Sequence, residues 1–531
     1  MCRRPGRTRA RLAGALLALL APCLLAAPIA ADPGPDLDAD LYPPVTAENP
    51  RVWPAASLPE GLALGAVDAW MAPERAAAAR VRWSRLVFDW RELQRTGPDD
   101  WSGSWLEGRG DESRLDLELR AGRRVVGLLA RTPAWAAPSG AAGDPPRNLD
   151  LPFDDPRNYW ARYVSTVVAR YAGRVDDWVI WNEPDVWSDE THSRQWTGTP
   201  RQYYQLLKVA YQAAKRANPG ARVWMAGLTY WWDYLDRREQ YFATILKLAA
   251  ADPTAPANNW YFDGAVLQLY NNPRLLFDVP RVFQRLMRDQ GIDPPKPVWV
   301  NETNVVPWDD PVAPLSRAHY RATMDEQASY LIQAVSYALA TGTDHMAVFK
   351  WVDDNGLRKG VEQAFGMLRV DATRSPRPVY EAYRAAQEWL APTTRAQLVD
   401  EGPVVKVYLE QPAAGRRVSV VWNVTGEPQE TLVETLGGEV LVLDKLGRPL
   451  GAPPPGSDNR VVLVLRPATA NTLPGFPEAF FIGGDPLLVV EPLTTDYAPL
   501  EPSAGLPRPP LQMYPDDAGS PPPDPTPEPV A

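Results

Sequence analysis

Short apolar runs and longer amphipathic segments alternate along the chain between about residues 50 and 390. Runs rich in Val, Leu and Trp are typical of buried strands, and the segments between them carry apolar residues at three- and four-residue steps. The apolar runs are GLALGAV (61–67), VRWSRLVF (81–88), RVVGLLA (124–130), DDWVIW (176–181), RVWMAGL (222–228), FDGAVLQLY (262–270), PVWVN (297–301) and HMAVFKW (345–351). The alternation predicts eight βα units.

Two of the intervening segments have especially clear helical faces. The first precedes Gly173 and the second ends at the Asn218-Pro219-Gly220 turn, where Pro cannot continue a helix and Gly tolerates the terminating conformation. Their apolar positions are Trp160, Tyr163, Val164, Val167, Val168 and Tyr171 in the first, and Tyr204, Leu207, Ala210, Tyr211 and Ala214 in the second. We interpret both stripes as core packing rather than as a cofactor site.

Eight βα units in about 340 residues fit a closed (β/α)8 barrel, a TIM barrel, whose active site lies at the C-terminal ends of the strands. A doubly wound open sheet is the alternative. No glycine-rich phosphate loop follows the first predicted strand, so the sequence favours the barrel and indicates no nucleotide cofactor.

The pattern changes after about residue 393. Short alternating strands separated by Gly and Pro turns predict a small antiparallel β domain, sandwich-like in character, over residues 393–470. These strands are VVKVYLE (404–410), RVSVVWNV (417–424), EVLVLD (439–444) and RVVLVLRP (460–467). The barrel is then expected over residues 51–392 and a largely disordered, Pro-rich tail over residues 471–531.

The N-terminus has the pattern of an export signal: a basic stretch, an apolar run and small residues over residues 1–31, followed by a linker over residues 32–50. Ile29 and Ala31 suit the cleavage site. Cys23 resembles a lipid-attachment cysteine, but Pro22 stands where such a site needs a small residue, so we expect cleavage without lipid anchoring. The sequence therefore predicts a secreted or cell-surface protein.

Charge and composition narrow the class of partner. The chain has 531 residues and a formal charge of −10, and its first 31 residues contain five arginines and no acid, so the remainder carries about −15. Nucleic acids and anionic membranes select basic surfaces, so this acidity disfavours both and suits a neutral, sugar-like substrate. No second stretch is long and apolar enough to span a bilayer. The three histidines lack ligand spacing, and we expect no metal and no cofactor.

Two glutamates follow predicted strands in similar settings. In VDDWVIWNEPDVW (175–187), Pro184 ends the strand and places Glu183 at its C-terminal rim. In KPVWVNETNVVPW (296–308), the strand finishes at Asn301-Glu302, which lies 119 residues further along. That separation corresponds to three βα units and puts the two carboxyl groups on strands four and seven, across the barrel mouth.

Opposed carboxyl groups are what glycoside hydrolysis requires, since one protonates the leaving oxygen and the other attacks the anomeric carbon. A retaining enzyme holds them about 5–5.5 Å apart, and each charge then disfavours ionisation of the other. A single Glu after a strand can also simply cap the next helix. Two at matching strand ends, each preceded by Asn, favour catalysis.

WNEP at the end of strand four and NET at the end of strand seven resemble the clan A glycoside hydrolases, family 39 in particular. The resemblance covers roughly residues 55–470, including the small β domain. It implies that Glu183 is the general acid/base, that Glu302 is the nucleophile and that Asn182 hydrogen-bonds the sugar 2-hydroxyl.

The resemblance extends to other strand ends. It implies that Arg85 on strand two holds the nucleophile ionised, that Tyr270 on strand six touches it and that Trp351 closes strand eight under the sugar. Where many members have a histidine, this chain has Gln268, which can hydrogen-bond a sugar but cannot titrate. Each also has a plainer interpretation, Arg85 as a surface ion partner, Tyr270 as a rim residue and Asn182 as a turn former.

Tryptophan is abundant, with 21 residues, and large flat rings with one N–H suit both sugar faces and cores. We expect about half of those beside the predicted rim to be packing residues, and Trp308 to bind substrate. The rim set is Trp135, Trp181, Trp187, Trp196, Trp231, Trp232, Trp308 and Trp351.

The sequence thus predicts an exported retaining β-glycosidase or endo-glycanase acting on an oligo- or polysaccharide. A catalytically inactive carbohydrate-binding protein on the same scaffold is the alternative, as is a transglycosidase with the same two glutamates. We expect the loops at residues 91–123 and 185–200 to form the walls of the substrate site.

Overall fold

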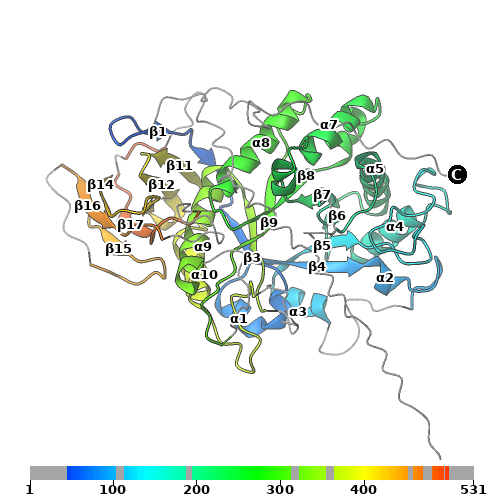
Figure 1. The fold of residues 1–531 in the computed structure, drawn as a ribbon, viewed down its shortest axis with the longest axis horizontal. Coiled ribbons are helices and arrows are strands. Elements are labelled where there is room, and N and C mark those ends of the chain that lie inside the picture. Colours follow the sequence, from blue (N-terminus) through cyan, green and yellow to red (C-terminus); the bar gives the residue numbers. More distant parts are fainter. Residues whose placement is uncertain are drawn as a thin grey trace, which may run out of the picture.

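The structure is a computed structural model. It describes residues 45–102, 113–186, 194–312, 322–353, 364–451, 458–469, 481–495 and 497–500. The predicted signal peptide with Cys23, Trp187, and parts of the linker, of both wall loops and of the tail lie outside these residues. Two parts are evident in Figure 1: a barrel, and a β domain beside it that contains β11, β12 and β14–β17.

Eight parallel strands form the barrel, in the order β3-β10-β9-β8-β7-β6-β5-β4. They are β3 (Ala63–Ala66), β4 (Trp83–Asp89), β5 (Arg124–Ala130), β6 (Asp177–Ile180), β7 (Arg222–Leu228), β8 (Gly264–Tyr270), β9 (Val298–Asn304) and β10 (His345–Val348). All eight predicted strands are present, and the predicted (β/α)8 barrel is confirmed.

The first and second strands of the barrel, β3 and β4, close the ring. The backbone N–H of Arg82 donates to the carbonyl of Leu64 at 3.1 Å, and the Trp83 indole N–H donates to the Ala63 carbonyl at 2.8 Å. Since all eight strands run in one direction, their C-terminal ends meet at a single mouth.

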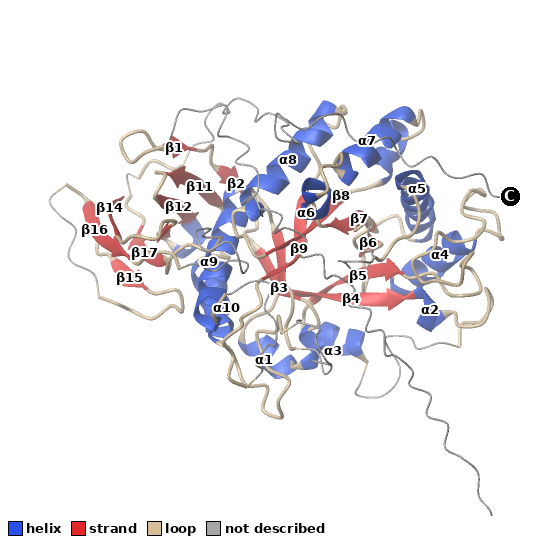
Figure 2. Cartoon of the chain, viewed as in Figure 1, coloured by secondary structure: helices blue, strands red, loops and turns tan. Residues whose placement is uncertain are grey.

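Helices surround the strands, as Figure 2 shows. They are α1 (Pro73–Ala78), α2 (Trp90–Leu93), α3 (Arg114–Arg120), α4 (Tyr159–Tyr171), α5 (Pro200–Ala217), α6 (Trp231–Leu235), α7 (Tyr241–Ala251), α8 (Leu275–Asp289), α9 (Met324–Ala340) and α10 (Pro378–Trp389). The apolar stripes predicted for residues 160–171 and 204–214 lie on α4 and α5, and every residue named in them is buried. Their assignment to core packing is correct.

The β domain is larger than the sequence predicted. One antiparallel sheet runs β1-β11-β12-β13-β17-β15, with β2 also paired to β11, and β14 pairs with β16 in a second, two-stranded sheet. Its strands are β1 (Arg51–Val52), β2 (Ala56–Ser57), β11 (Arg395–Asp400), β12 (Val404–Gln411), β13 (Arg416–Asn423), β14 (Gln429–Glu434), β15 (Leu441–Leu443), β16 (Arg460–Leu465) and β17 (Leu487–Pro492). A cluster of buried Val and Leu side chains from both sheets lies between them.

Two predicted domain boundaries are therefore wrong. The strand β17 lies in the segment assigned to the tail, and it occupies an internal position between β13 and β15. At the other end, β1 and β2 lie in the segment assigned to the barrel but pair with β11. Both errors arise because short strands that pair over a long sequence distance leave little local periodicity to detect.

The β domain is attached to the barrel through α9. Its Gln333 side chain donates to the carbonyl of Gly484 and accepts from the N–H of Gly483, both at 3.0 Å. Tyr337 of the same helix packs edge-on against Trp422 of β13.

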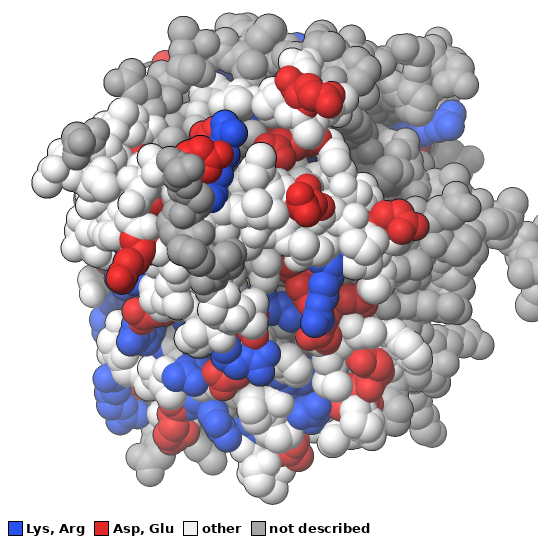
Figure 3. Space-filling model, turned by 90° about the vertical axis from the view of Figure 1, so that its left-hand side faces the viewer, with Lys and Arg blue, Asp and Glu red and all other residues white. Residues whose placement is uncertain are grey.

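On the face in Figure 3, basic side chains lie beside acidic ones rather than gathering in one patch.

Candidate active site

Glu302 lies at the barrel mouth on β9 and is buried, with 5% of its surface exposed. In the pairing with β8, Val300 is opposite Leu267 but Glu302 is opposite Gln268, so Asn301 is an extra residue on β9. Such a bulge re-aims a side chain. The strand does not finish at Asn301-Glu302, as predicted, but continues through Asn304.

Three donors surround the Glu302 carboxylate. Arg85 of β4 forms an ion pair with Oε1, and both side chains are nearly buried. The Tyr270 hydroxyl donates to Oε2, and the Gln268 amide donates to Oε1 at 3.0 Å. A guanidinium, a phenol and an amide together fix the orientation of the carboxylate and stabilise its negative charge.

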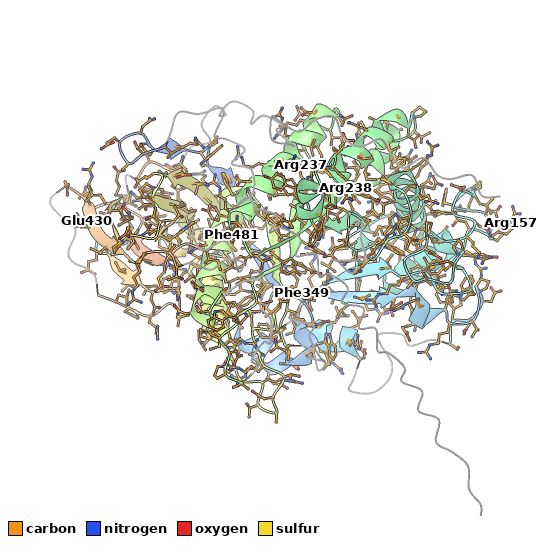
Figure 4. The ribbon with its side chains drawn as sticks, in the orientation of Figure 1. Arg157, Arg237, Arg238, Phe349, Glu430 and Phe481 are labelled. Carbon is orange, nitrogen blue, oxygen red and sulfur yellow. The ribbon has the colours of Figure 1, made fainter. Side chains whose placement is uncertain are left out.

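Tyr270 is held as a neutral donor. Burial, followed by the nearby charge of Glu302, raises the pKa of the Tyr270 hydroxyl well above its ordinary value. Its ring packs against Phe365 and edge-on against Phe349, which is labelled near the centre of the molecule in Figure 4. The phenol therefore keeps its proton and its position beside the carboxylate.

Glu183 follows β6 and is half-buried. Its backbone N–H donates to the carbonyl of Gly227 at 3.0 Å, and its φ of 44° lies in the left-handed region that non-glycine residues rarely adopt. Its carboxyl Oε2 accepts from the Gln195 amide at 3.0 Å. A strained backbone held by its neighbours is a recurrent feature of functional sites.

The pKa of Glu183 is raised to about 8. Burial is the main cause, followed by the negative charges of Glu302 and Asp185, while Arg85 and the hydrogen bond from Gln195 oppose the rise. At neutral pH the group is therefore a protonated acid. A carboxyl group that keeps its proton at neutral pH is what general acid catalysis needs.

Gln268 links the two halves of the site. Its amide nitrogen donates to the Asn182 side chain at 2.7 Å as well as to Glu302. A Cβ on Gly227 would come within 2.5 Å of that nitrogen, so a glycine is needed on β7 to leave room for it. Gln268 thus positions Asn182, which precedes the acid, relative to Glu302.

The two tryptophans singled out from the sequence lie in different surroundings. Trp308, on the loop after β9, is 48% exposed. Trp351 is fully buried; its indole N–H donates to the carbonyl of Ala72 at 3.1 Å, and its ring packs against Tyr380 and Tyr383. Trp308 thus has an exposed ring, whereas Trp351 packs against α10, and the contact of either ring with a sugar stays a prediction.

Two residues of the site were not anticipated. Gln195 lies in the loop between β6 and α5 and reaches back to Glu183, a return that no periodicity reveals. Asp185 lies two residues after Glu183 and is buried, with 1% exposed. Asp185 could have been recognised from the sequence, because it is an acidic residue directly after the WNEP motif that ends the apolar run.

Within the described ranges, no group of three or more His, Cys, Asp or Glu side chains is arranged to hold a metal ion. In the same part of the chain, no helix has the length and hydropathy needed to cross a bilayer.

Several solved structures with the same fold are glycosidases. A family 39 glycoside hydrolase from Bacteroides cellulosilyticus matches with a TM-score of 0.57 and 16% identity, covering 85% of this chain and 83% of that one. A glucosidase from Croceicoccus marinus matches at 0.52 and 13%, covering 85% and 98%. A monomeric beta-xylosidase from Caulobacter crescentus matches at 0.51 and 14%, covering 83% and 98%. At these identities the likeness shows the fold, and it agrees with the (β/α)8 barrel and β domain expected from the sequence. No family model and no curated protein matches the chain.

Proposed function

We propose that the protein is an exported retaining glycoside hydrolase that cleaves β-linked glycosides through a covalent intermediate on Glu302. The proposal rests on the different surroundings of the two glutamates. Burial and neighbouring charge hold a proton on Glu183, whose pKa is about 8, while Arg85, Tyr270 and Gln268 surround Glu302 with donors.

In the first step the Glu302 carboxylate attacks the anomeric carbon, the glycosidic C–O bond breaks, and the Glu183 proton passes to the leaving oxygen. The negative charge of Glu302 is consumed in the new ester bond. One of the causes that raise the pKa of Glu183 is then removed, so its carboxylate is left as the base for the second step.

In the second step Glu183 takes a proton from water, the water oxygen attacks the anomeric carbon, and the bond to Glu302 breaks. The Tyr270 hydroxyl and the Arg85 guanidinium then stabilise the carboxylate that leaves. In this proposal Asn182, which Gln268 holds by a hydrogen bond, binds the sugar hydroxyl next to the anomeric carbon, and the exposed ring of Trp308 packs against a sugar.

The proposal is tested by incubating wild type and Glu302→Gln with aryl β-xyloside, glucoside, galactoside and mannoside and with soluble polysaccharides, measuring released sugar. The names of the xylosidase and glucosidase that share the fold put xylosides and glucosides first in this panel. Turnover in wild type that is lost in Glu302→Gln supports the proposal. Turnover that survives in the variant contradicts it, transfer of the sugar to a saccharide identifies a transglycosidase, and binding without turnover identifies the inactive binding protein.

A further inference from the structure

Asp185 ties together the two strand ends that flank the acid. Its buried carboxylate oxygen Oδ2 accepts the backbone N–H of Thr229 at 2.7 Å, the Thr229 hydroxyl at 2.8 Å and the backbone N–H of Tyr230 at 3.2 Å. Asp185 stands two residues after Glu183, and Thr229 follows β7 directly. The loop that carries the acid is thereby fixed to the end of the next strand.

The other carboxyl oxygen of Asp185, Oδ1, is buried, and no described group donates a hydrogen bond to it. Glu183 on its own loop, Tyr203 of α5 and Tyr241 of α7 are among the titratable groups whose charges interact with Asp185. The groups that act on Glu183 are Glu302, Arg85, Asp185 and Tyr270. Arg85, whose charge lowers the pKa of Glu183, is ion-paired with Glu302, whereas Asp185 adds a negative charge on the loop that carries Glu183.

We propose that Asp185 is a positioning residue whose buried charge keeps the proton on Glu183 and so extends acid catalysis to higher pH. Its role rests on the proposed function, since it matters for catalysis only if Glu183 is the acid. A buried carboxylate near a second carboxyl group disfavours ionisation of that group.

The order of ionisation agrees with this role. Burial raises the pKa of Asp185 to about 6, against the opposing hydrogen bonds from Thr229 and Tyr230. Asp185 is therefore already ionised where Glu183, with its pKa of about 8, begins to lose its proton. The charge of Asp185 is therefore present over the pH range in which Glu183 loses its proton, and it delays the loss of that proton.

Asp185→Asn removes the negative charge but can keep the hydrogen bonds to Thr229 and Tyr230. The Asn side-chain oxygen can accept the same three hydrogen bonds, so the loop stays attached while the charge disappears. Asp233→Asn is the control, because Asp233 is also fully buried and accepts the backbone N–H of Tyr241 at 2.7 Å; it differs from Asp185 in its ion pair with Arg238 at 3.4 Å. Its charge is not among those that raise the pKa of Glu183.

The measurement is the pH profile of kcat/KM on a phenyl glycoside, which needs the acid, and on a dinitrophenyl glycoside, which does not. We expect Asp185→Asn to move the alkaline limb for the phenyl glycoside to lower pH by on the order of one unit, and Asp233→Asn to leave it at the wild-type value. An unmoved limb in Asp185→Asn, or equal shifts in both variants, overturns the proposal. If the extra N–H of Asn prevents folding, Asp185→Ser removes the same charge and is measured instead.

A second readout does not depend on turnover. A diazoacetamide esterifies the protonated carboxylic acid, so the labelling of Glu183 against pH, followed by peptide mass spectrometry, reports its titration directly. A lower midpoint in Asp185→Asn than in wild type supports the role of Asp185 even if no glycoside is cleaved, in which case the proposed function alone fails. Identical midpoints overturn the inference whatever the activity.

Discussion

Replacing Glu183 by Ala removes the proton donor and leaves the nucleophile with its donors Arg85, Tyr270 and Gln268 in place. The loss therefore depends on how much the leaving group needs a proton. General acid catalysis contributes about 10²–10⁴-fold, or about 3–5 kcal/mol of transition-state stabilisation. We expect kcat/KM on a phenyl glycoside to fall by that factor, and kcat/KM on a dinitrophenyl glycoside to fall by less than about tenfold, because dinitrophenolate leaves without protonation.

The assay compares initial rates on the two glycosides for wild type, Glu183→Ala and Glu302→Ala. Glu302→Ala is the matched comparison, since without a nucleophile both substrates should lose turnover alike. Thermal unfolding of each variant checks that the fold is intact. Equal losses on the two glycosides in Glu183→Ala would refute the assignment of the acid.

Three further outcomes follow from the contacts of the site and its supports. Tyr270→Phe keeps the ring but removes a hydrogen bond to a charged group worth about 1.5–3 kcal/mol, so we expect kcat/KM to fall about 10–150-fold with little change in melting temperature; unchanged kinetics would contradict this. The pKa of Glu183 is about 8, and the acid loses its proton as pH rises through that value. On phenyl glycosides kcat/KM should then decline about tenfold for each pH unit above it, and a limb near pH 5 would count against the burial argument. Arg377, fully buried and ion-paired to Asp310 and Asp353 at 2.7 Å each, should be structural: Arg377→Met is expected to lower the free energy of unfolding in urea by about 3–5 kcal/mol, and an unchanged midpoint would contradict that.

The strands of the barrel could be predicted closely because each is buried on both faces and reads as a continuous apolar run. RVVGLLA and RVWMAGL coincide with β5 and β7 residue for residue. The position of Glu183 at a strand end also followed from local chemistry, since Pro184 stops the ladder there. The burial of the strands and their common direction were enough to predict that their C-terminal ends meet at one mouth.

Other features depend on contacts that the sequence does not encode locally. The bulge that places Glu302 opposite Gln268 depends on the register with β8, which is a property of two strands. Gln195 donates a hydrogen bond to Glu183 from 12 residues further along the chain, a contact that no local pattern predicts. The strand β17 is apolar and short, and its partners β13 and β15 had to be known before LLVVEP could be assigned to a sheet rather than to the tail.

Trapping the covalent intermediate shows whether Glu302 attacks the anomeric carbon. A 2-fluoro glycoside with a dinitrophenyl leaving group, of the sugar that the panel identifies, is incubated with wild type, and the protein is digested and analysed by mass spectrometry. We expect one fluoroglycosyl group per chain, attached to the peptide that contains Glu302, with loss of activity at the same rate. A label on another carboxylate, or inactivation without any covalent adduct, would contradict it.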